Sequence, residues 1–224
     1  MDKIKIFLLK LLIRLLRPRN AGVTFFRAYK ERNVFKDILQ IIKKVAPYSS
    51  DVEMFHIASI VLSMSKIEGD IAEVGVANGA TAKIISYFKN NKKLHLFDTF
   101  DGIPFVGRED DKSISAGDCK SSLEFVKENL KGEKNIEFYK GIFPDTGDKI
   151  KNNRFSFVHL DVDIYETTKK SLEFFYDKMN KGGIILSHDY SQYKGVKQAF
   201  DEFFKDKPEA VVALCESQCF VVKL

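Results

Sequence analysis

From residue 70 onward, short apolar segments alternate with longer segments whose apolar residues recur at helical spacing. The apolar segments that predict strands are residues 71–76, 94–98, 135–140, 155–161, 183–188, 210–214 and 219–222. The segments that predict helices after residue 120 are 121–130, 165–179 and 196–204, the second ended by a helix stop at Asn180-Lys181-Gly182-Gly183. Because parallel strands are joined by crossovers, usually helices, this alternation predicts an α/β fold with a mostly parallel sheet covered on both faces.

The first predicted strand runs into a turn that contains two glycines, Gly75 and Gly79. Glycine permits a tight turn and lets a ligand approach the backbone closely. Asn78 and Thr81 are suited to cap the helix that follows. In open α/β sheets, a strand that leads through such a turn into a helix N-terminus often cradles a cofactor. The spacing is G-x-x-x-G and differs from the dinucleotide pattern G-x-G-x-x-G, so an ordinary strand-to-helix turn is an equally good interpretation of this motif alone.

Acidic residues, together with one histidine, gather where the predicted strands end. These positions are Glu73 and Asp98 on the first two strands, Asp161 and Asp163 after the fourth, and His188 and Asp189 after the fifth. Ligands of open α/β sheets bind beyond the carboxyl ends of the strands, and crowded carboxylates repel one another. We therefore expect a cation here, either a divalent metal or a positively charged cofactor.

Four of these residues, Asp161, Asp163, His188 and Asp189, suit a hard ion such as Mg²⁺, and the imidazole also suits Mn²⁺ or another transition ion. The alternative is that Asp161 and Asp163 cap the next helix and that His188 is a loop residue. His159, inside the fourth strand, is expected in the core.

Residues 1–19 carry the net charge of the chain, which is +5, because they hold six basic residues and one acidic residue. The remainder is close to neutral, which argues against a general nucleic-acid-binding surface. Residues 4–16 are almost continuously apolar, but a bilayer span needs about 20 residues. We expect this segment to lie as a helix on an anionic membrane. A helix docked on the protein's own core or on a partner subunit is the alternative.

Three regions follow from these patterns: a basic amphipathic segment at 1–19, a helical extension at 20–69 and an α/β domain at 70–224. Residues 20–69 predict helices around 35–42 and 52–66 and carry no obvious catalytic motif. Three cysteines and no evident cleavable signal peptide favour a reducing cytoplasm. Two of them, Cys215 and Cys219, are expected to flank the turn between the last two strands.

Residues 99–120 interrupt the alternation with a long polar stretch that contains three glycines. Loops longer than about 12–15 residues in compact domains are often functional or disordered. We expect a mobile lid or substrate loop here, with a solvated insertion as the alternative.

Five sequence blocks carry a family resemblance: Glu-Val-Gly-Val-Ala-Asn-Gly (73–79), Phe-Asp-Thr-Phe-Asp-Gly-Ile-Pro (97–104), Lys-Gly-Ile-Phe-Pro-Asp-Thr (140–146), Leu-Asp-Val-Asp-Ile-Tyr-Glu-Thr-Thr (160–168) and Gly-Gly-Ile-Ile-Leu-Ser-His-Asp-Tyr (182–190). In this order they resemble the macrocin O-methyltransferase family, class I enzymes that use S-adenosylmethionine (SAM). The resemblance covers roughly residues 70–205. It implies a Rossmann-like, seven-stranded sheet and a metal-assisted methylation of a hydroxyl, often on a sugar.

The resemblance also implies roles for individual residues. Glu73, Gly75 and Gly79 would hold the methionine end of SAM, Asp98 would bind its ribose, and Gly141 and Ile142 would lie near its adenine. Asp161 and Asp189 match metal ligands, and Asp163 matches the general base. The family usually has Asp-Asp-Tyr where this chain has His188-Asp189-Tyr190. We expect His188 to ligate the metal, Mg²⁺ or another divalent ion, and it is the next candidate base if no metal takes part.

The sequence thus predicts a SAM-dependent O-methyltransferase that acts on a sugar or glycan-type hydroxyl. We expect it in the cytoplasm, at the inner face of the membrane through residues 1–19, and as a homo-oligomer. The alternatives are a related metal-dependent hydroxylase or hydrolase-like enzyme, or a non-catalytic membrane-associated module in glycan assembly. The glycine spacing disfavours a nicotinamide dehydrogenase.

Overall fold

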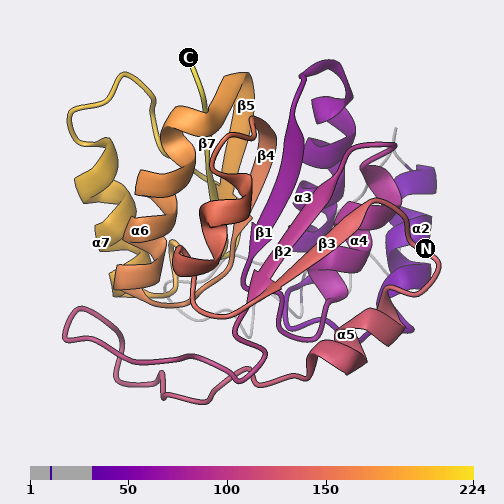
Figure 1. The fold of residues 1–224 in the computed structure, drawn as a ribbon, viewed down its shortest axis with the longest axis horizontal. Helices are drawn as coiled ribbons and strands as arrows, with labels where there is room; N and C mark the ends of the chain where they lie inside the picture. Colours follow the sequence, from indigo (N-terminus) through magenta and orange to yellow (C-terminus); the bar gives the residue numbers. More distant parts are fainter. Residues whose placement is uncertain (1–10, 12–31) are drawn as a thin grey trace. The chain divides into compact units, whose positions relative to one another are not determined.

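The computed structural model describes residue 11 and residues 32–224, and seven strands within this part form one sheet in the order β3-β2-β1-β4-β5-β7-β6 (Figure 1). The strands are β1 (Asp70–Val74), β2 (Leu94–Asp98), β3 (Ile136–Lys140), β4 (Phe155–Leu160), β5 (Met179–Ser187), β6 (Val212–Ala213) and β7 (Cys219–Val222). The first five are parallel, while β7 runs antiparallel to β5 and to β6. The predicted mostly parallel α/β fold is confirmed.

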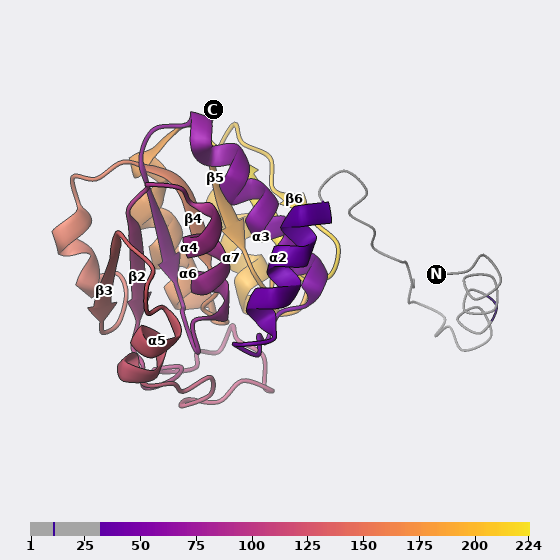
Figure 2. The same ribbon diagram turned by 90° about the vertical axis from the view of Figure 1, so that its right-hand side faces the viewer.

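Helices cover both faces of this sheet, as the alternation predicts. They are α2 (Arg32–Ile42), α3 (Asp51–Ser63), α4 (Ala80–Phe88), α5 (Leu123–Asn129), α6 (Tyr165–Phe175) and α7 (Lys194–Phe204), with short 3₁₀ helices η1 (Met64–Lys66), η2 (Asp145–Ile150) and η3 (Tyr176–Lys178). Figure 2 shows α2, α3 and α4 stacked over one face, where their apolar side chains pack with Ile71 and Leu96 of the sheet. On the other face, α6 and α7 pack with Val74 and Val158.

The carboxyl ends of the central strands lie level with one another. Val74 pairs with Phe97 of β2 and with Leu160 of β4, and Leu160 pairs with Ser187 of β5. The residues that follow these strands therefore come together at one edge of the sheet. The strand order also reverses between β1 and β4, which is where open α/β sheets bind their ligands.

One local prediction is wrong. The residues expected to stop the helix at 180–183 belong to strand β5, and the preceding helix ends earlier, at Phe175, and continues as η3. The backbone of Gly182 donates to the carbonyl of Lys223, and Lys223 donates back to Gly183. Pairing with the end of the chain therefore draws the glycines into the sheet, where a local helix-stop pattern does not place them.

The first and second predicted regions are described in part. The basic segment 1–19 lies outside the described residues, apart from residue 11. Within the described part of the chain, no helix is long and apolar enough to cross a membrane. Helices α2 and α3 share an apolar core with the sheet, so the described residues of the predicted helical extension pack directly on the α/β domain.

Candidate functional site

A cavity of about 770 Å³ opens at the level carboxyl ends of β1, β2, β4 and β5. On one side it is lined by the turns after β1, β2 and β3, including Gly75, Asp98, Gly141 and Ile142. On the other side it is lined by Asp161, Asp163, His188 and Asp189. The structure therefore brings most of the predicted site residues to one cavity, although they come from five separate segments.

Gly75 allows the strand ends to approach each other. Its φ is +88°, and a Cβ at this position would lie 1.7 Å from the carbonyl oxygen of Asp161. An L side chain rarely adopts this φ, and the contact leaves no room for a methyl group. The turn after β1 is thus packed directly on the acidic end of β4.

Asp98 holds the same turn in place. Its Oδ2 accepts hydrogen bonds from the backbone N–H groups of Val76, at 2.7 Å, and Ala77, at 2.9 Å. Its Oδ1 accepts from the N–H of Phe100 at 2.6 Å. The carboxylate lies on the cavity lining and shapes the turn that faces it.

Two of the residues predicted to bind SAM are not on the cavity lining. Glu73 is fully buried, and its Oε1 lies 2.9 Å from Nδ1 of His159 on β4, which is itself in the core as predicted. Burial raises the pKa of Glu73. Gly79, with a φ of +82°, is the N-cap of α4. The contact of these two residues with SAM stays a prediction.

The predicted metal ligands form a compact cluster. One ligand atom from each of Asp161, His188 and Asp189 can be chosen so that all three lie within 4.8 Å of one another. Nδ1 of His188 lies 2.9 Å from Asp189 Oδ2 and 3.5 Å from Asp161 Oδ1. Asp163 and Asp189 both have positive φ, +62° and +63°, a conformation that aspartate tolerates better than most residues.

The electrostatics of this cluster favour a bound cation. Burial and the neighbouring Asp161 and Asp189 raise the pKa of Asp163 to about 9. Burial opposes the charged form of His188, but Asp161, Asp189 and Glu53 outweigh it and raise the pKa of His188 to about 12. Four carboxyl groups thus surround one imidazole, and carboxylates crowded in this way are relieved by positive charge.

The donor set also fits a metal ion. Nδ1 of His188 is buried, and it makes no well-aligned hydrogen bond with any residue that the structure describes. This ring nitrogen is buried, lacks such a bond and lies next to two carboxylates, so it is a candidate metal ligand.

Sequence reasoning missed two residues of this site, Glu53 on α3 and Ser217 just before β7. Glu53 Oε2 lies 3.2 Å from His188 Nε2, and its Oε1 accepts from the Ser217 hydroxyl at 2.6 Å. Burial opposes the ionised form of Glu53, but hydrogen bonds from His188 and Ser217 outweigh it and lower its pKa to about 2. The sequence signal was present as a capping box with Ser50, which by itself explains a glutamate at this position.

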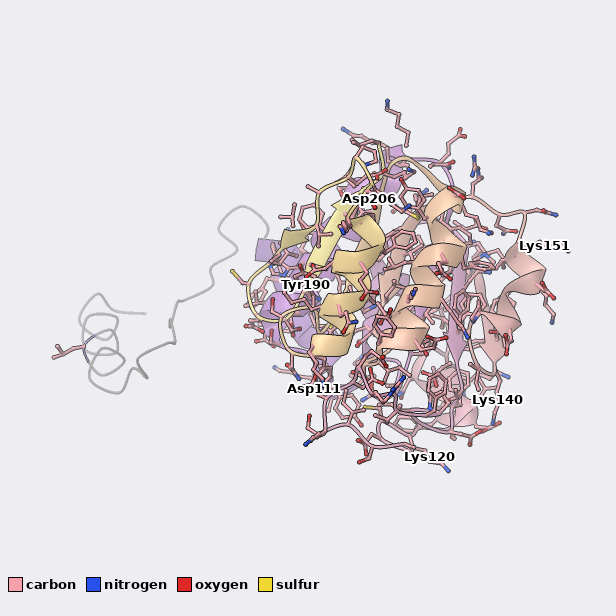
Figure 3. All side chains as sticks on the ribbon, turned by 90° about the vertical axis from the view of Figure 1, so that its left-hand side faces the viewer. Asp111, Lys120, Lys140, Lys151, Tyr190 and Asp206 are labelled. Carbon is pink, nitrogen blue, oxygen red and sulfur yellow. The ribbon has the colours of Figure 1, made fainter. Side chains whose placement is uncertain are left out.

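The long loop at 99–120 is anchored at its centre. Asp110 accepts from the N–H of Tyr165 at 2.7 Å, and Asp111 accepts from the N–H of Lys194 at 2.7 Å, so the loop caps both α6 and α7. Figure 1 shows it passing below these two helices, and Figure 3 shows Asp111 and Lys120 at the same end of the molecule as Lys140. Gly102, Ile103, Pro104 and Cys119 from the loop line the cavity. These residues therefore border the cavity, while the lid motion and the solvated insertion both stay predictions for the loop.

A family model described as Macrocin-O-methyltransferase (TylF) matches residues 52–212. The chain belongs to the macrocin O-methyltransferase family. The match begins in α3, so Glu53 lies inside the matched range, although the resemblance noted from the sequence begins near residue 70.

Two curated relatives of this family member come from Streptomyces. It is 26% identical over 159 residues to demethyldecarbamoylnovobiocin O-methyltransferase of Streptomyces niveus, and this alignment covers 62% of this chain and 59% of the relative. It is 26% identical over 141 residues to 8-demethyl-8-(2,3-dimethoxy-alpha-L-rhamnosyl)-tetracenomycin-C 4'-O-methyltransferase of Streptomyces olivaceus, covering 56% of this chain and 54% of the relative. The chain thus spans less than two thirds of the length of both.

The fold is shared with solved methyltransferases. The structure of the O-methyltransferase NovP superposes with a TM-score of 0.64 at 22% identity, covering 76% of this chain and 79% of that one. The family member described here therefore has the Rossmann-like class I methyltransferase fold.

Proposed function

We propose that this chain transfers a methyl group from SAM to a hydroxyl of a sugar or glycan-type acceptor, with the help of a divalent cation. The observation that carries the proposal is the shared cavity. It joins the glycine turn and Asp98 at one side to the Asp161–His188–Asp189 cluster at the other. A methyl donor and an acceptor bound in one cavity can be aligned for an in-line displacement, in which positioning supplies much of the rate.

The cofactor side of the cavity suits SAM. The turn after β1 approaches through Gly75, and Asp98 lies at the end of the neighbouring strand, 23 residues later in the sequence, as in ribose-binding α/β sites. Gly141 and the half-exposed Ile142 border the same side and are suited to contact a flat base. Family membership supports the same assignment.

The acceptor side is rich in hydrogen-bonding groups. Ser49, Ser50, Gln192, Tyr193, Glu216 and Ser217 line the cavity around the acidic cluster. Hydroxyls, amides and carboxylates of this kind match a hydroxyl-rich acceptor, because each acceptor hydroxyl must exchange its water for a partner. The relative from Streptomyces olivaceus, whose name describes a rhamnosyl acceptor, supports the sugar class.

Asp161, His188 and Asp189 would hold the cation, which supplies positive charge beside the acceptor oxygen and favours loss of its proton. Asp163 then serves as the general base. The acceptor oxygen forms a bond to the methyl carbon as the carbon–sulfur bond breaks, and the hydroxyl proton passes to the Asp163 carboxylate. Burial, Asp161 and Asp189 raise the pKa of Asp163 to about 9, so a cation held by Asp161 and Asp189 would also favour the ionised form of Asp163 that a general base needs.

The test is a methyl-transfer assay on the full chain. Radiolabelled SAM is incubated with a panel of nucleotide sugars and glycosylated aromatic acceptors, with added divalent ion or with excess chelator, and SAM binding is measured separately by calorimetry. We expect SAM binding without any acceptor, and metal-dependent label transfer to at least one sugar-bearing acceptor. Failure to bind SAM would contradict the proposal. Full activity in excess chelator would show that the reaction does not need a metal ion, and the metal would be dropped from the proposal.

The cytoplasmic location, the contact of residues 1–19 with anionic membrane and the homo-oligomer remain predictions from the sequence.

A further inference from the structure

We infer that Glu53 on α3 positions His188 as a nitrogen ligand, so that the site binds a first-row transition ion in preference to Mg²⁺. The inference rests on the proposed function, which assigns the cation to Asp161, His188 and Asp189. It adds a residue from outside that cluster and a consequence for the kind of ion bound.

The two ring nitrogens of His188 face different surroundings. Nε2 lies 3.2 Å from Glu53 Oε2, while Nδ1 lies between the carboxylates of Asp189, at 2.9 Å, and Asp161, at 3.5 Å. Both nitrogens lie beside carboxylates, and a ligating imidazole must lack a hydrogen on one of them. A carboxylate accepts only from a protonated nitrogen, so with a cation bound in the cluster Glu53 keeps the hydrogen on Nε2 and Nδ1 is the ligating atom. That tautomer leaves the lone pair on Nδ1 pointing into the Asp161–Asp189 cluster.

Glu53 is held firmly enough to fix this orientation. The residue is 4% exposed. Its Oε1 accepts from the hydroxyl of Ser217 at 2.6 Å and from the Ser217 backbone N–H at 3.2 Å, and its Oε2 accepts from the N–H of Ser50 at 3.0 Å. These contacts come from the turn before β7 and from the start of α3, so the carboxylate has little freedom to turn away. Carboxylates that accept from the outer nitrogen of a ligating histidine orient the ring and raise its basicity.

The resulting donor set is one imidazole nitrogen and two carboxylates. Mg²⁺ prefers oxygen donors in near-ideal octahedral geometry, whereas imidazole suits transition ions. An aspartate in place of His188 would make the set all oxygen. The histidine, oriented by Glu53, therefore shifts the preference of this site away from Mg²⁺.

Mn²⁺ is a suitable probe, because its electron paramagnetic resonance spectrum reports the concentration of unbound Mn²⁺ and also shows whether a nitrogen atom ligates the bound ion. The full chain, freed of metal, is titrated with Mn²⁺ alone, and Mg²⁺ is then added in competition. We expect electron spin-echo modulation from one imidazole ¹⁴N in the wild-type protein. We expect His188→Asp to abolish this modulation and to lower the preference for Mn²⁺ over Mg²⁺ by at least about tenfold.

Glu53→Gln removes the carboxylate charge and keeps the shape of the side chain. We expect it to weaken Mn²⁺ binding by about 10–100-fold. His56→Ala is the matched control, because His56 lies on the same helix and contacts the same turn, with Nδ1 2.9 Å from Gln218 Oε1, but it is not part of the cluster. The control should bind Mn²⁺ like the wild type.

Three results would overturn the inference: no ¹⁴N modulation in the wild type, equal affinity for Mn²⁺ and Mg²⁺, or Glu53→Gln binding Mn²⁺ within twofold of His56→Ala. The first two need no variant and so do not depend on whether a substituted chain folds. SAM binding and methyl transfer are measured on the same preparations. If the Mn²⁺ experiments give one of these three results but the protein still methylates an acceptor with SAM, this inference is rejected and the methyltransferase function is retained.

Discussion

At the residue scale, the site depends on positions where the backbone conformation and close contacts allow only glycine. Gly75 is the sharpest case, because both its φ of +88° and its 1.7 Å Cβ distance to the Asp161 carbonyl oxygen exclude a methyl group. Gly132 offers a comparison, since its φ is +89° but a Cβ there would meet nothing within 4 Å. The two positions separate the cost of the backbone conformation from the cost of the close contact.

We expect Gly75→Ala to lower the free energy of unfolding by about 3 kcal/mol and to abolish measurable SAM binding, because the strand ends must separate. Gly132→Ala should cost only about 1–2 kcal/mol, the cost of the left-handed conformation. Urea denaturation and calorimetry with SAM make the measurement. Equal losses of stability in the two variants would show that the contact with Asp161 does not matter.

The acids of the cluster are expected to divide their roles, with Asp163 as base and Asp161 as metal ligand. Asp163→Asn keeps the shape of the side chain and removes the base, so turnover should fall by roughly 10²–10⁴-fold while SAM and metal affinity persist. Asp161→Asn should instead weaken metal binding, and added divalent ion should partly restore its rate. Turnover of both variants against metal concentration distinguishes them. Wild-type turnover in Asp163→Asn would remove it as the base.

At the element scale, side chains from loops hold the helices that flank the cavity. Asp110 is buried, and it accepts from the N–H of Tyr165 at the start of α6 and from the N–H of Gly107 within its own loop, both at 2.7 Å. Ile103 and Ile114 of the same loop pack with Ile164. A stretch that looks like free loop from its polarity is therefore joined to the helix layer through its carboxylates.

Asp110→Ala should lower the free energy of unfolding by about 1–2 kcal/mol, because it removes a cap and leaves two N–H groups without their acceptor. It should also speed amide hydrogen exchange across residues 99–120. Asp101→Ala is the control, since Asp101 is exposed and its ion pairs with Lys140 and Lys120 span 3.4 and 4.0 Å. The control should change stability by no more than about 0.5 kcal/mol. Unchanged exchange in Asp110→Ala would mean that the cap does not anchor the loop.

At the scale of the whole molecule, Glu209 joins the residues that follow β7 to η3. This buried carboxylate accepts from Lys223 Nζ at 2.7 Å and from the Tyr176 hydroxyl at 2.9 Å. Burial opposes its ionised form, but the hydrogen bonds from Lys223 and Tyr176 outweigh burial and lower its pKa. Glu209 therefore contributes stability that is present above its unfolded-state pKa and is lost as the pH falls through its lower folded-state pKa.

Glu209→Gln should accordingly lower the melting temperature at pH 7 and flatten the loss of stability between pH 5 and the acid transition, because the variant has no carboxyl group to titrate. Melting curves of both proteins across this pH range make the comparison. Glu202→Gln, a change at a surface carboxylate that accepts from Tyr165 at 2.6 Å, controls for the loss of one negative charge. A pH profile of Glu209→Gln parallel to that of the wild type would contradict the assignment.

What the sequence determined by itself is local in origin. Apolar segments of fixed period placed β2 and β7 at their observed bounds, and they placed Asp161 and Asp189 just after strands β4 and β5. Because the carboxyl ends of parallel strands meet at one edge, a local pattern was sufficient to predict that these acids would converge.

What only the tertiary structure decided depends on contacts between distant segments. Glu53 reaches Ser217 across 164 residues, and the glycines before Ile184 join β5 because they pair with the end of the chain. Glu73 lies near the end of β1 as predicted, but its side chain contacts His159 in the core and does not line the cavity. The spacing of apolar residues in the sequence indicates which face of a helix or strand is buried. The packing of the whole chain decides which distant segment covers that face.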